Sequence, residues 1–214
     1  NESITYDYLK ENLFIIGMGK HGGKELNVSS DIDLIFFTKD EILENHDTAA
    51  ALYSFVKSFL DFVRMPSDNG FIYRVDLRLR PDGHDGPIIS GVKNSIKYYR
   101  ERGHNWEYQA FVKARYIWGS KKLHDNFHSA MEKIIFNAGN SENILVEMTD
   151  IKNRIEKKIV LRTKTVNFKL GPGGIRDIEF IIQFLQLVHG FRYTEIREHN
   201  SILALKKLMT FNII

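Results

Sequence analysis

The 214-residue chain contains no cysteine and only four prolines. Without cysteine there are no disulfide bonds, no thiolate catalyst and no cysteine-ligated zinc site. The apolar segments are too short or too interrupted to cross a membrane, and the N-terminus lacks the basic start and apolar core of a signal peptide. We therefore expect a cytoplasmic protein with no membrane partner.

The sequence also lacks a strong excess of either charge. Its 30 Lys and Arg residues against 27 Asp and Glu give a formal net charge of +3. This balance suits small anionic ligands but not the concentrated basic face of a nucleic-acid-binding protein, so no nucleic acid is expected as a partner. The chain begins without Met and ends on an apolar tail, Phe211-Asn212-Ile213-Ile214, so we expect it to be truncated at its C-terminal end.

Hydrophobic periodicity divides the chain into two parts. Residues 13–18, 31–37 and 72–79 alternate as strands do, and 49–64 has a helical pattern. A short edge strand is predicted at 88–89, after the turn signals around Pro81 and Gly86. From about residue 90 the pattern is helical, with apolar stripes at Ile151, Ile155 and Ile159, and at Ile178, Ile181, Ile182, Leu185 and Val188.

The most informative motif is the acidic pair Asp31 and Asp33, which opens an apolar strand. Side chains two residues apart on a strand lie on the same face, so the carboxylates repel each other unless a cation relieves them. Pairs of this kind also occur as solvated strand ends or turn caps. Here a glycine loop with the pair Gly22-Gly23 precedes the acids, and this combination indicates magnesium and phosphate chemistry.

A third acid, Asp76, stands among arginines. On a continuous strand Arg74, Asp76, Arg78 and Arg80 would share one face, where ion pairing is the simplest reading. However, three guanidinium groups exceed what one carboxylate can satisfy, and the surplus suits bidentate phosphate recognition. Asp31, Asp33 and Asp76 would then form a triad that holds metal ions.

Five sequence blocks together resemble the glutamine synthetase adenylyltransferase/adenylyl-removing enzyme family, within the DNA polymerase β-like nucleotidyltransferase superfamily. The resemblance runs from about residue 13 to 205. The blocks are Gly17-x-Gly19-Lys20-x-Gly22-Gly23-x-Glu25-Leu26, Ser29-Ser30-Asp31-Ile32-Asp33-Leu34, Asp76-x-Arg78-x-Arg80-Pro81, Trp106-Glu107 followed by Lys113-Ala114-Arg115, and Lys169-Leu170-Gly171-Pro172-Gly173-Gly174-Ile175-Arg176.

The resemblance implies an α+β fold, with a nucleotidyltransferase palm and mixed sheet in residues 1–117 and a helical bundle in 118–214. It implies magnesium-dependent removal of AMP from a tyrosine of glutamine synthetase by phosphate, giving ADP, because Arg176 follows Gly-Gly-Ile as in the adenylyl-removing unit. The run Glu107-Tyr108-Gln109-Ala110 resembles the adenylylating unit instead. Adenylylation from ATP, a nucleotidyltransferase acting on nucleic acid, and a regulatory domain that senses nucleotide stay as alternatives.

The same resemblance assigns roles to individual residues. Asp31, Asp33 and Asp76 are expected to be catalytic and to bind Mg²⁺, as two ions, with ATP, ADP and phosphate as substrates or products. The phosphate cradle is either Gly22-Gly23 or Gly19-Lys20. The expected partners are glutamine synthetase, a nitrogen-signalling regulatory protein and a second catalytic unit in the full-length chain. The expected nucleotide- and phosphate-binding residues are Gly19, Lys20, Gly22, Gly23, Ser30, Arg78, Arg80, Lys113, Arg115 and Arg176.

Overall fold

The computed structural model describes residues 4–28, 30–67, 70–71, 73–138 and 173–214, together with residues 146, 149 and 168. The chain forms two compact units. One contains Asn1–Arg102 and Lys113–Glu132, and the other contains Gly103–Val112 and Lys133–Ile214. The backbone thus passes between the units after residues 102, 112 and 132.

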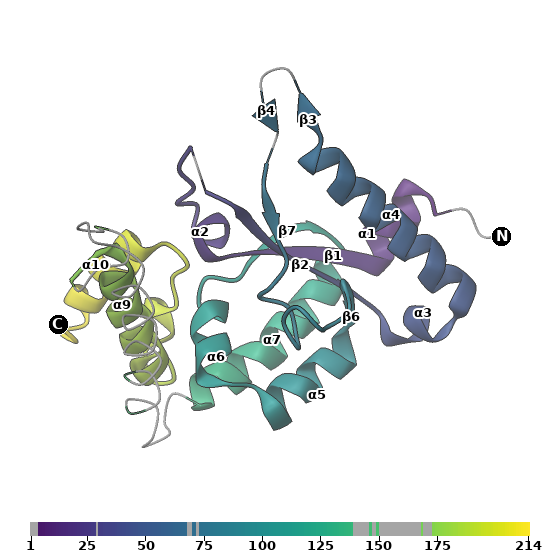
Figure 1. Ribbon diagram of the computed structural model, residues 1–214. Coiled ribbons are helices and arrows are strands. Elements are labelled where there is room, and N and C mark those ends of the chain that lie inside the picture. The colour runs from purple at the N-terminus through teal and green to yellow at the C-terminus, as the bar shows by residue number, and fades with distance from the viewer. Residues whose placement is uncertain are drawn as a thin grey trace. The chain divides into compact units, whose positions relative to one another are not determined.

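The first unit is built around a mixed five-stranded sheet (Figure 1). β2 pairs antiparallel with β1 on one side, and β1 pairs antiparallel with β7. On its other side β2 pairs in parallel with β5 and then with β6. This arrangement confirms the α+β class. The elements are α1 (Tyr6–Asn12), β1 (Leu13–Met18), α2 (Gly19–Gly22), β2 (Ile32–Thr38), α3 (Asp40–Glu44), α4 (His46–Arg64), β3 (Pro66–Ser67), β4 (Gly70–Phe71), β5 (Val75–Asp76), β6 (Ile89–Gly91), α5 (Val92–Arg102), β7 (Arg115–Gly119) and most of α7 (Lys121–Ala138).

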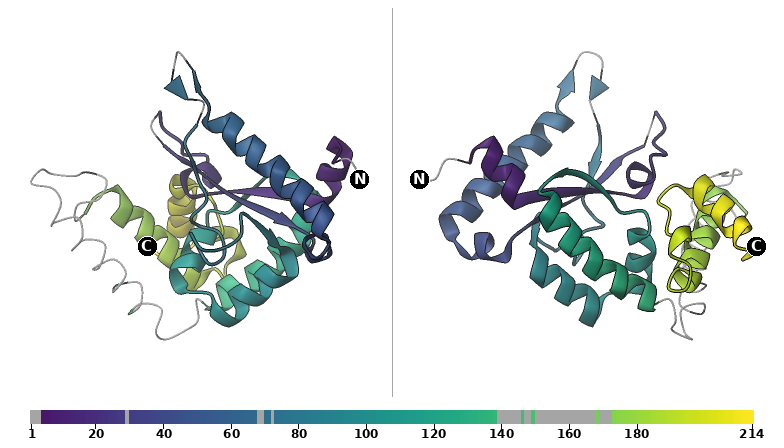
Figure 2. Two further views of the ribbon diagram at one scale, coloured as in Figure 1. Left: turned by 45° about the vertical axis from the view of Figure 1, so that its right-hand side comes forward. Right: turned by 180° about the vertical axis from the view of Figure 1, so that it is seen from behind.

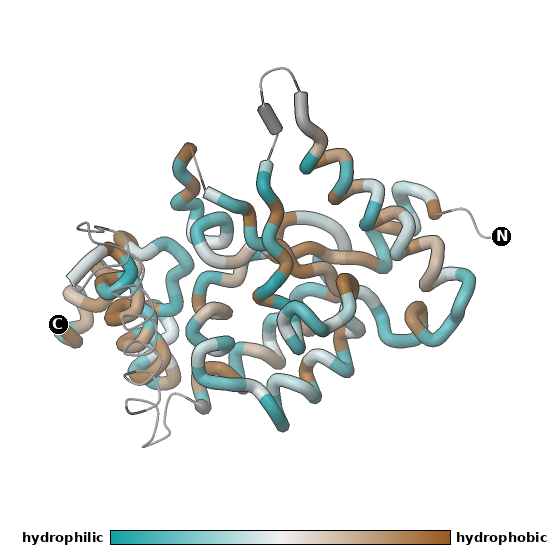
Figure 3. The backbone as a smooth tube through the Cα atoms, in the orientation of Figure 1, coloured by the Kyte–Doolittle hydropathy of each residue, from teal (hydrophilic) through white to brown (hydrophobic). Residues whose placement is uncertain are grey.

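Both faces of the central strands are buried by helices, α4 on one side and α7 on the other (Figure 2). Ile32, Leu34 and Phe36 of β2 belong to one buried cluster with the apolar stripe of α4. On the opposite face the Phe127 ring of α7 lies 4.5 Å from the Phe37 ring and 5.7 Å from that of Phe14, centroid to centroid. In Figure 3, hydrophobic residues accordingly run along parts of β1 and β2.

The strand at 13–18 has the predicted bounds, and that at 31–37 is shifted by one residue, to Ile32–Thr38. The helix predicted at 49–64 is confirmed but begins earlier, at His46. Asn45 caps its start by accepting hydrogen bonds from the amides of Asp47 and Thr48. The short edge strand predicted at 88–89 is found as β6.

Two predictions for the first unit are wrong. The strand expected over 72–79 is paired with β2 only at Val75 and Asp76, because the following backbone turns back on itself. The amide of Arg80 donates to the carbonyl of Leu77, which closes that turn. Strand β7 lies in the region expected to be helical throughout, and it supplies one edge of the sheet.

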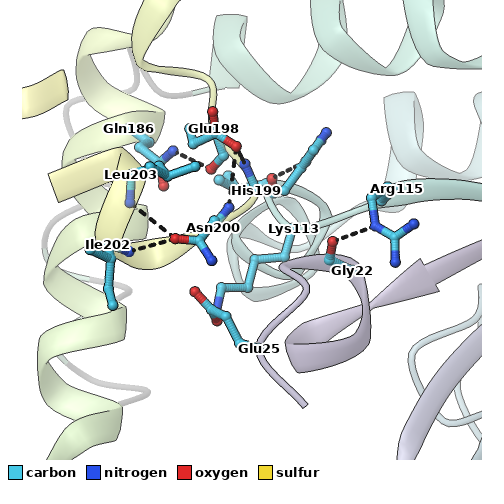
Figure 4. A network of polar contacts seen from close by, with 11 residues as sticks. Gly22, Glu25, Lys113, Arg115, Gln186, Glu198, His199, Asn200, Ile202 and Leu203 are labelled. Atoms are coloured by element: carbon cyan, nitrogen blue, oxygen red, sulfur yellow. Dashed lines mark hydrogen bonds and ion pairs between the residues drawn. The ribbon is translucent and has the colours of Figure 1, made fainter. Parts of the chain in front are cut away.

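The second unit contains α6 (Asn105–Phe111), the end of α7, α9 (Ile175–His189), η1 (Thr194–Ile196) and α10 (Ser201–Thr210). Ile182 of α9 packs in a buried cluster with Ile196, Ala204 and Leu208. Buried Gln186 fixes the loop after α9 by donating from Nε2 to the carbonyls of Ile196 and Glu198 (Figure 4). This unit is therefore held by apolar packing and by side-chain bonds to loop carbonyls.

The apolar stripe predicted for α9 is only partly confirmed. Ile182 is buried and Leu185 packs against the same cluster, but Ile178 and Ile181 are more than half exposed. The buried face instead includes Leu187 and Gln186, so it is rotated relative to the one predicted. The stripe at Ile151, Ile155 and Ile159 lies outside the described residues. Within the described part of the chain, no helix is long and apolar enough to span a membrane.

The core contact between α7 and the sheet gives a stability prediction. Phe127→Ala should lower the free energy of unfolding by about 3–5 kcal/mol, because the removed ring leaves a cavity against Phe14 and Phe37. Phe62→Ala serves as the control, since the Phe62 side chain of α4 is largely exposed. Urea denaturation measures both. An equal effect of the two substitutions would contradict this packing.

Candidate active site

Asp33 and Asp76 are neighbours because β2 and β5 run in parallel. They are direct partners in the strand register, as are Ile32 and Val75 one residue earlier. Register partners of neighbouring strands lie about 4.8 Å apart and place their side chains on the same face. The amide of Ile32 donates to the carbonyl of Arg74 at 2.8 Å, which extends the pairing toward Asp31. The structure therefore brings two of the three predicted acids together.

Arginines accompany the acids as close ion-pair partners. Arg74 Nε lies 2.6 Å from Asp31 Oδ1, next to the start of β2. The Arg78 amide donates to Asp76 Oδ1 at 2.8 Å and Nε donates to Oδ2 at 2.9 Å, so both ends of the carboxylate are held. These side-chain hydrogen bonds from Arg78 keep the pKa of the Asp76 carboxyl below its ordinary value. Arg78 thus pairs with Asp76, whereas Arg74 pairs across to Asp31.

Arg80 has a different role from the phosphate contact predicted for it. Its side chain is buried and donates to the carbonyls of Leu77, His84 and Gly86 at 2.8–3.0 Å. These bonds fold the loop that follows Asp76 onto the guanidinium group. We interpret Arg80 as the residue that shapes this loop, because its donors already point at loop carbonyls.

The turn after β1 meets the acidic pair at Gly19. Gly19 has a φ of +52°, and a Cβ atom added there would lie 2.7 Å from Asp33 Oδ2. Only glycine fits both the backbone conformation and this close approach. Lys20 follows directly and is partly exposed, whereas the amide of buried Gly23 is used within the turn, donating to the carbonyl of Gly19 at 3.0 Å. The Gly23 amide is therefore already engaged, whereas Gly19 lies directly against an acid of the candidate site.

Gly22 lies against the segment that leads into β7. A Cβ atom there would stand 1.9 Å from the carbonyl oxygen of Lys113. Arg115 donates from Nε to the Gly22 carbonyl and from Nη2 to the His21 carbonyl, each at 2.8 Å (Figure 4). Lys113 is buried, and its Nζ lies 2.5 Å from Glu25 Oε2. Lys113 and Arg115, both predicted to bind anions, thus contact the glycine turn.

Two remaining predicted phosphate-binding residues lie in other surroundings. Ser30 Oγ donates to Asn27 Oδ1 at 2.6 Å and accepts the Asn27 amide, which closes the loop before Asp31. Arg176 belongs to the second unit, in the first turn of α9, where Asp177 Oδ2 accepts the amide of Gly173 at 2.8 Å. The start of that glycine run, residues 169–172, lies outside the described residues.

The interpretation that no two histidines have the four-residue spacing of a helical metal site is wrong, because α7 carries such a pair. His124 and His128 are four residues apart, with ring centroids separated by 5.5 Å. His124 packs edge-on against Phe14 and Tyr116, and burial lowers its pKa. Among the described residues, no group of three His, Asp or Glu side chains is arranged to hold a metal ion. These histidines are therefore read as packing residues.

The acidic site nevertheless has donors suited to magnesium. Mg²⁺ prefers oxygen ligands and is commonly held by one or two carboxylates together with substrate phosphates and water. Asp33 and Asp76 supply such a pair from neighbouring positions of two paired strands. The Arg74 and Arg78 side chains are more than half exposed, so a cation could take their place at the carboxylates. The residues present fit a magnesium ion at Asp33 and Asp76.

Two family models match the chain. The model described as Glutamate-ammonia ligase adenylyltransferase matches residues 5–130, and that described as GlnD PII-uridylyltransferase matches residues 149–214. Proteins named bifunctional glutamine synthetase adenylyltransferase/adenylyl-removing enzyme are similar to it. Those of Shewanella woodyi, Methylococcus capsulatus and Streptomyces coelicolor are 36%, 35% and 34% identical, over 92%, 92% and 94% of this chain. The chain covers 21% of each relative, about a fifth of its length.

The contact between Gly19 and Asp33 can be measured as stability. Gly19→Ala should destabilise the fold by more than the about 1–2 kcal/mol expected for an L-residue at positive φ, because its methyl group also meets Asp33 Oδ2. Gly83→Ala is a matched control, since Gly83 has a φ of +57° and the nearest atom to its added Cβ is 3.6 Å away. Urea unfolding compares them. Equal losses would argue against the Asp33 contact.

The pairing of Asp76 with Arg78 predicts a dependence of stability on pH. Because the folded-state pKa of Asp76 is lowered, its carboxylate stabilises the fold at neutral pH, and this contribution is lost as the pH falls through that lowered pKa. Wild type should therefore be more stable than Asp76→Asn at pH 7, with the difference shrinking in acid below about pH 4. Urea unfolding from pH 7 to pH 2 measures this. In an Arg78→Ala background the pH-dependent difference should be smaller.

Proposed function

The chain belongs to the glutamate-ammonia ligase adenylyltransferase family, and from that premise we propose that its first unit transfers an adenylyl group to or from glutamine synthetase. The names of the bifunctional relatives state both directions of this reaction for those proteins. The observation that carries the proposal is the pairing of Asp33 with Asp76 beside Gly19. One carboxylate of this pair lies against a glycine turn, an arrangement suited to a phosphate group and its counter-ion.

We propose that the direction is removal of AMP. An oxygen of inorganic hydrogen phosphate attacks the phosphorus of the AMP–tyrosine ester, and the bond from phosphorus to the tyrosine oxygen breaks. The proton of the phosphate passes to the freed tyrosine oxygen, which restores the hydroxyl, and ADP is the second product. Phosphate is already anionic, so the step needs little help from a general base. Arg176 after Gly-Gly-Ile supports the same direction through the family resemblance.

We assign the residues of the site to two roles, metal binding and phosphate binding, according to their positions. Asp33 and Asp76 would hold Mg²⁺, with Asp31 joining them if Arg74 releases its carboxylate. An ion held by these carboxylates would supply positive charge to offset that of the phosphate groups. Gly19 and Lys20 lie beside Asp33 and would contact the phosphate. Arg78 is largely exposed and would turn from Asp76 to the substrate anion, because its guanidinium group can bind phosphate in a bidentate manner.

We also propose the larger organisation that the resemblance implies. Residues 1–117 correspond to a polymerase β-like palm, and 118–214 to a helical bundle. The match of residues 149–214 to a uridylyltransferase model supports a bundle that accompanies nucleotidyl-transferring domains. In the longer protein, a second catalytic unit and a nitrogen-signalling regulatory protein would complete the set of partners.

The experiment follows AMP on glutamine synthetase in both directions. The protein is incubated with magnesium, phosphate and AMP-modified glutamine synthetase, and in parallel with magnesium, ATP and the unmodified enzyme. We expect phosphate-dependent release of ADP in the first reaction. Incorporation of AMP in the second reaction without release in the first would assign the adenylylating direction instead.

A substitution at the acidic site separates catalysis from folding. Asp33→Asn should lower the transfer rate by at least about 100-fold, the effect typical of losing one electrostatic group at a reaction centre, while circular dichroism stays unchanged. Asp61→Asn, on the exposed part of α4, is the control and should keep full activity. Unimpaired transfer by Asp33→Asn would show that the metal site is assigned to the wrong residues.

A further inference from the structure

We infer that Arg115 and the ion pair of Lys113 with Glu25 are positioning residues, which hold the Gly19–Gly22 turn in register with Asp33. This inference rests on the proposed nucleotidyl transfer, because it assigns the turn a place in that site. The sequence predicted that Lys113 and Arg115 bind phosphate. In this inference they instead fix the backbone of the turn, and the turn contacts the phosphate.

The first support is where the Arg115 donors point. Arg115 opens β7, and its Cα is the register partner of Gly17 at the end of β1. From there its guanidinium group reaches the carbonyls of His21 and Gly22, the last two residues of α2, at 2.8 Å each. Two neighbouring carbonyls are thus held by one planar fork, which a single ammonium group cannot reproduce.

The second support is the burial of Lys113 and its pairing with Glu25. The side chain of Lys113 is 5% exposed and that of Glu25 is 17% exposed, and the charged atoms lie 2.5 Å apart. A buried ion pair contributes little net stability but strongly disfavours arrangements that separate its partners. It therefore holds Glu25, three residues after the turn, to Lys113, two residues before β7 (Figure 4).

The third support is that these contacts set the distance between Gly19 and the Asp33 carboxylate. Gly22 approaches the Lys113 carbonyl so closely that no side chain fits between them, while Gly19, three residues earlier, lies against Asp33 Oδ2. One short helical turn joins these two contacts, so a shift at its end moves Gly19 and Lys20 relative to the acids. Displacements of about 1 Å at a reacting site can lower rates by about 100-fold.

The test uses Arg115→Lys and Arg115→Ala in the full-length protein. Positioning predicts that both variants lose kcat by about 100-fold with little change in the KM for phosphate, because Lys keeps the charge but not the fork. A direct phosphate contact predicts instead a raised KM that Lys largely restores, and this result would overturn the inference. Arg100→Lys and Arg100→Ala, at an exposed position of α5, are the controls.

Exchanging the charges of the ion pair supplies a rescue test. Glu25→Lys alone should impair kcat, and the double variant Glu25→Lys with Lys113→Glu should recover part of it by restoring a pair across the same contact. If the double variant is as inactive as a Lys113→Glu single variant that still folds, Lys113 acts on the substrate and the inference fails for this pair.

Amide hydrogen exchange of the ligand-free protein tests the inference without any reaction. The amides of Gly23 and Glu25 donate to the carbonyls of Gly19 and Lys20, so they report on the turn. Arg115→Lys and Arg115→Ala should accelerate exchange there and leave β2 unchanged. Unchanged exchange would overturn the inference. If exchange is faster in the variants but the wild-type protein transfers no adenylyl group, the proposed reaction is refuted. The conclusion that Arg115 supports the turn would still hold.

Discussion

The parallel pairing of β2 with β5 is the constraint on which the candidate site depends. It lasts for only two register pairs, yet it sets Asp33 beside Asp76 although 43 positions separate them in the sequence. A helix outside the sheet also holds this short strand, because Arg64 of α4 donates a hydrogen bond to the carbonyl of Val75 at 3.0 Å. The helix that buries one face of the sheet therefore also supports the strand that carries an acid.

Electrostatics around the acids follow from this arrangement. Two carboxylates on one face repel each other, and guanidinium groups on the same short segment offset that repulsion. The arginines with exposed side chains can exchange partners at little cost, whereas buried Arg80 is fixed to loop carbonyls. Similar residues within seven positions thus act differently because their burial differs.

The sequence predicts best what depends on periodicity, and least what depends on side chains that reach across the fold. β1, β2 and α4 were predictable because long apolar patterns are tied to burial. β5 was predicted too long, since no periodicity reveals that the turn after Asp76 closes by hydrogen bonds from Arg78 and Arg80. β7 was missed because its residues are half-buried and stand between helices.

Charged residues are the clearest example of this limit for the candidate site. Arg115 is recognisable in the sequence as a cation, but its acceptors are backbone carbonyls more than ninety residues away. Backbone carbonyls occur at every position, so no residue type marks them as partners. Asp31 and Asp33, in contrast, could be proposed as a pair from their spacing alone, whereas the pairing of Asp33 with Asp76 depends on strand register.

The segment between β5 and β6 has a consequence for how members of this family can diverge. It leaves the sheet at Asp76 and returns at Ile89 to the same edge of β2, so both of its ends are anchored to one strand. The closure entropy of such a loop rises only slowly with its length. Insertions between the residues whose carbonyls Arg80 binds would therefore lengthen the loop while both of its ends stay paired with β2, which makes this loop a place where new surface can evolve beside an unchanged strand register.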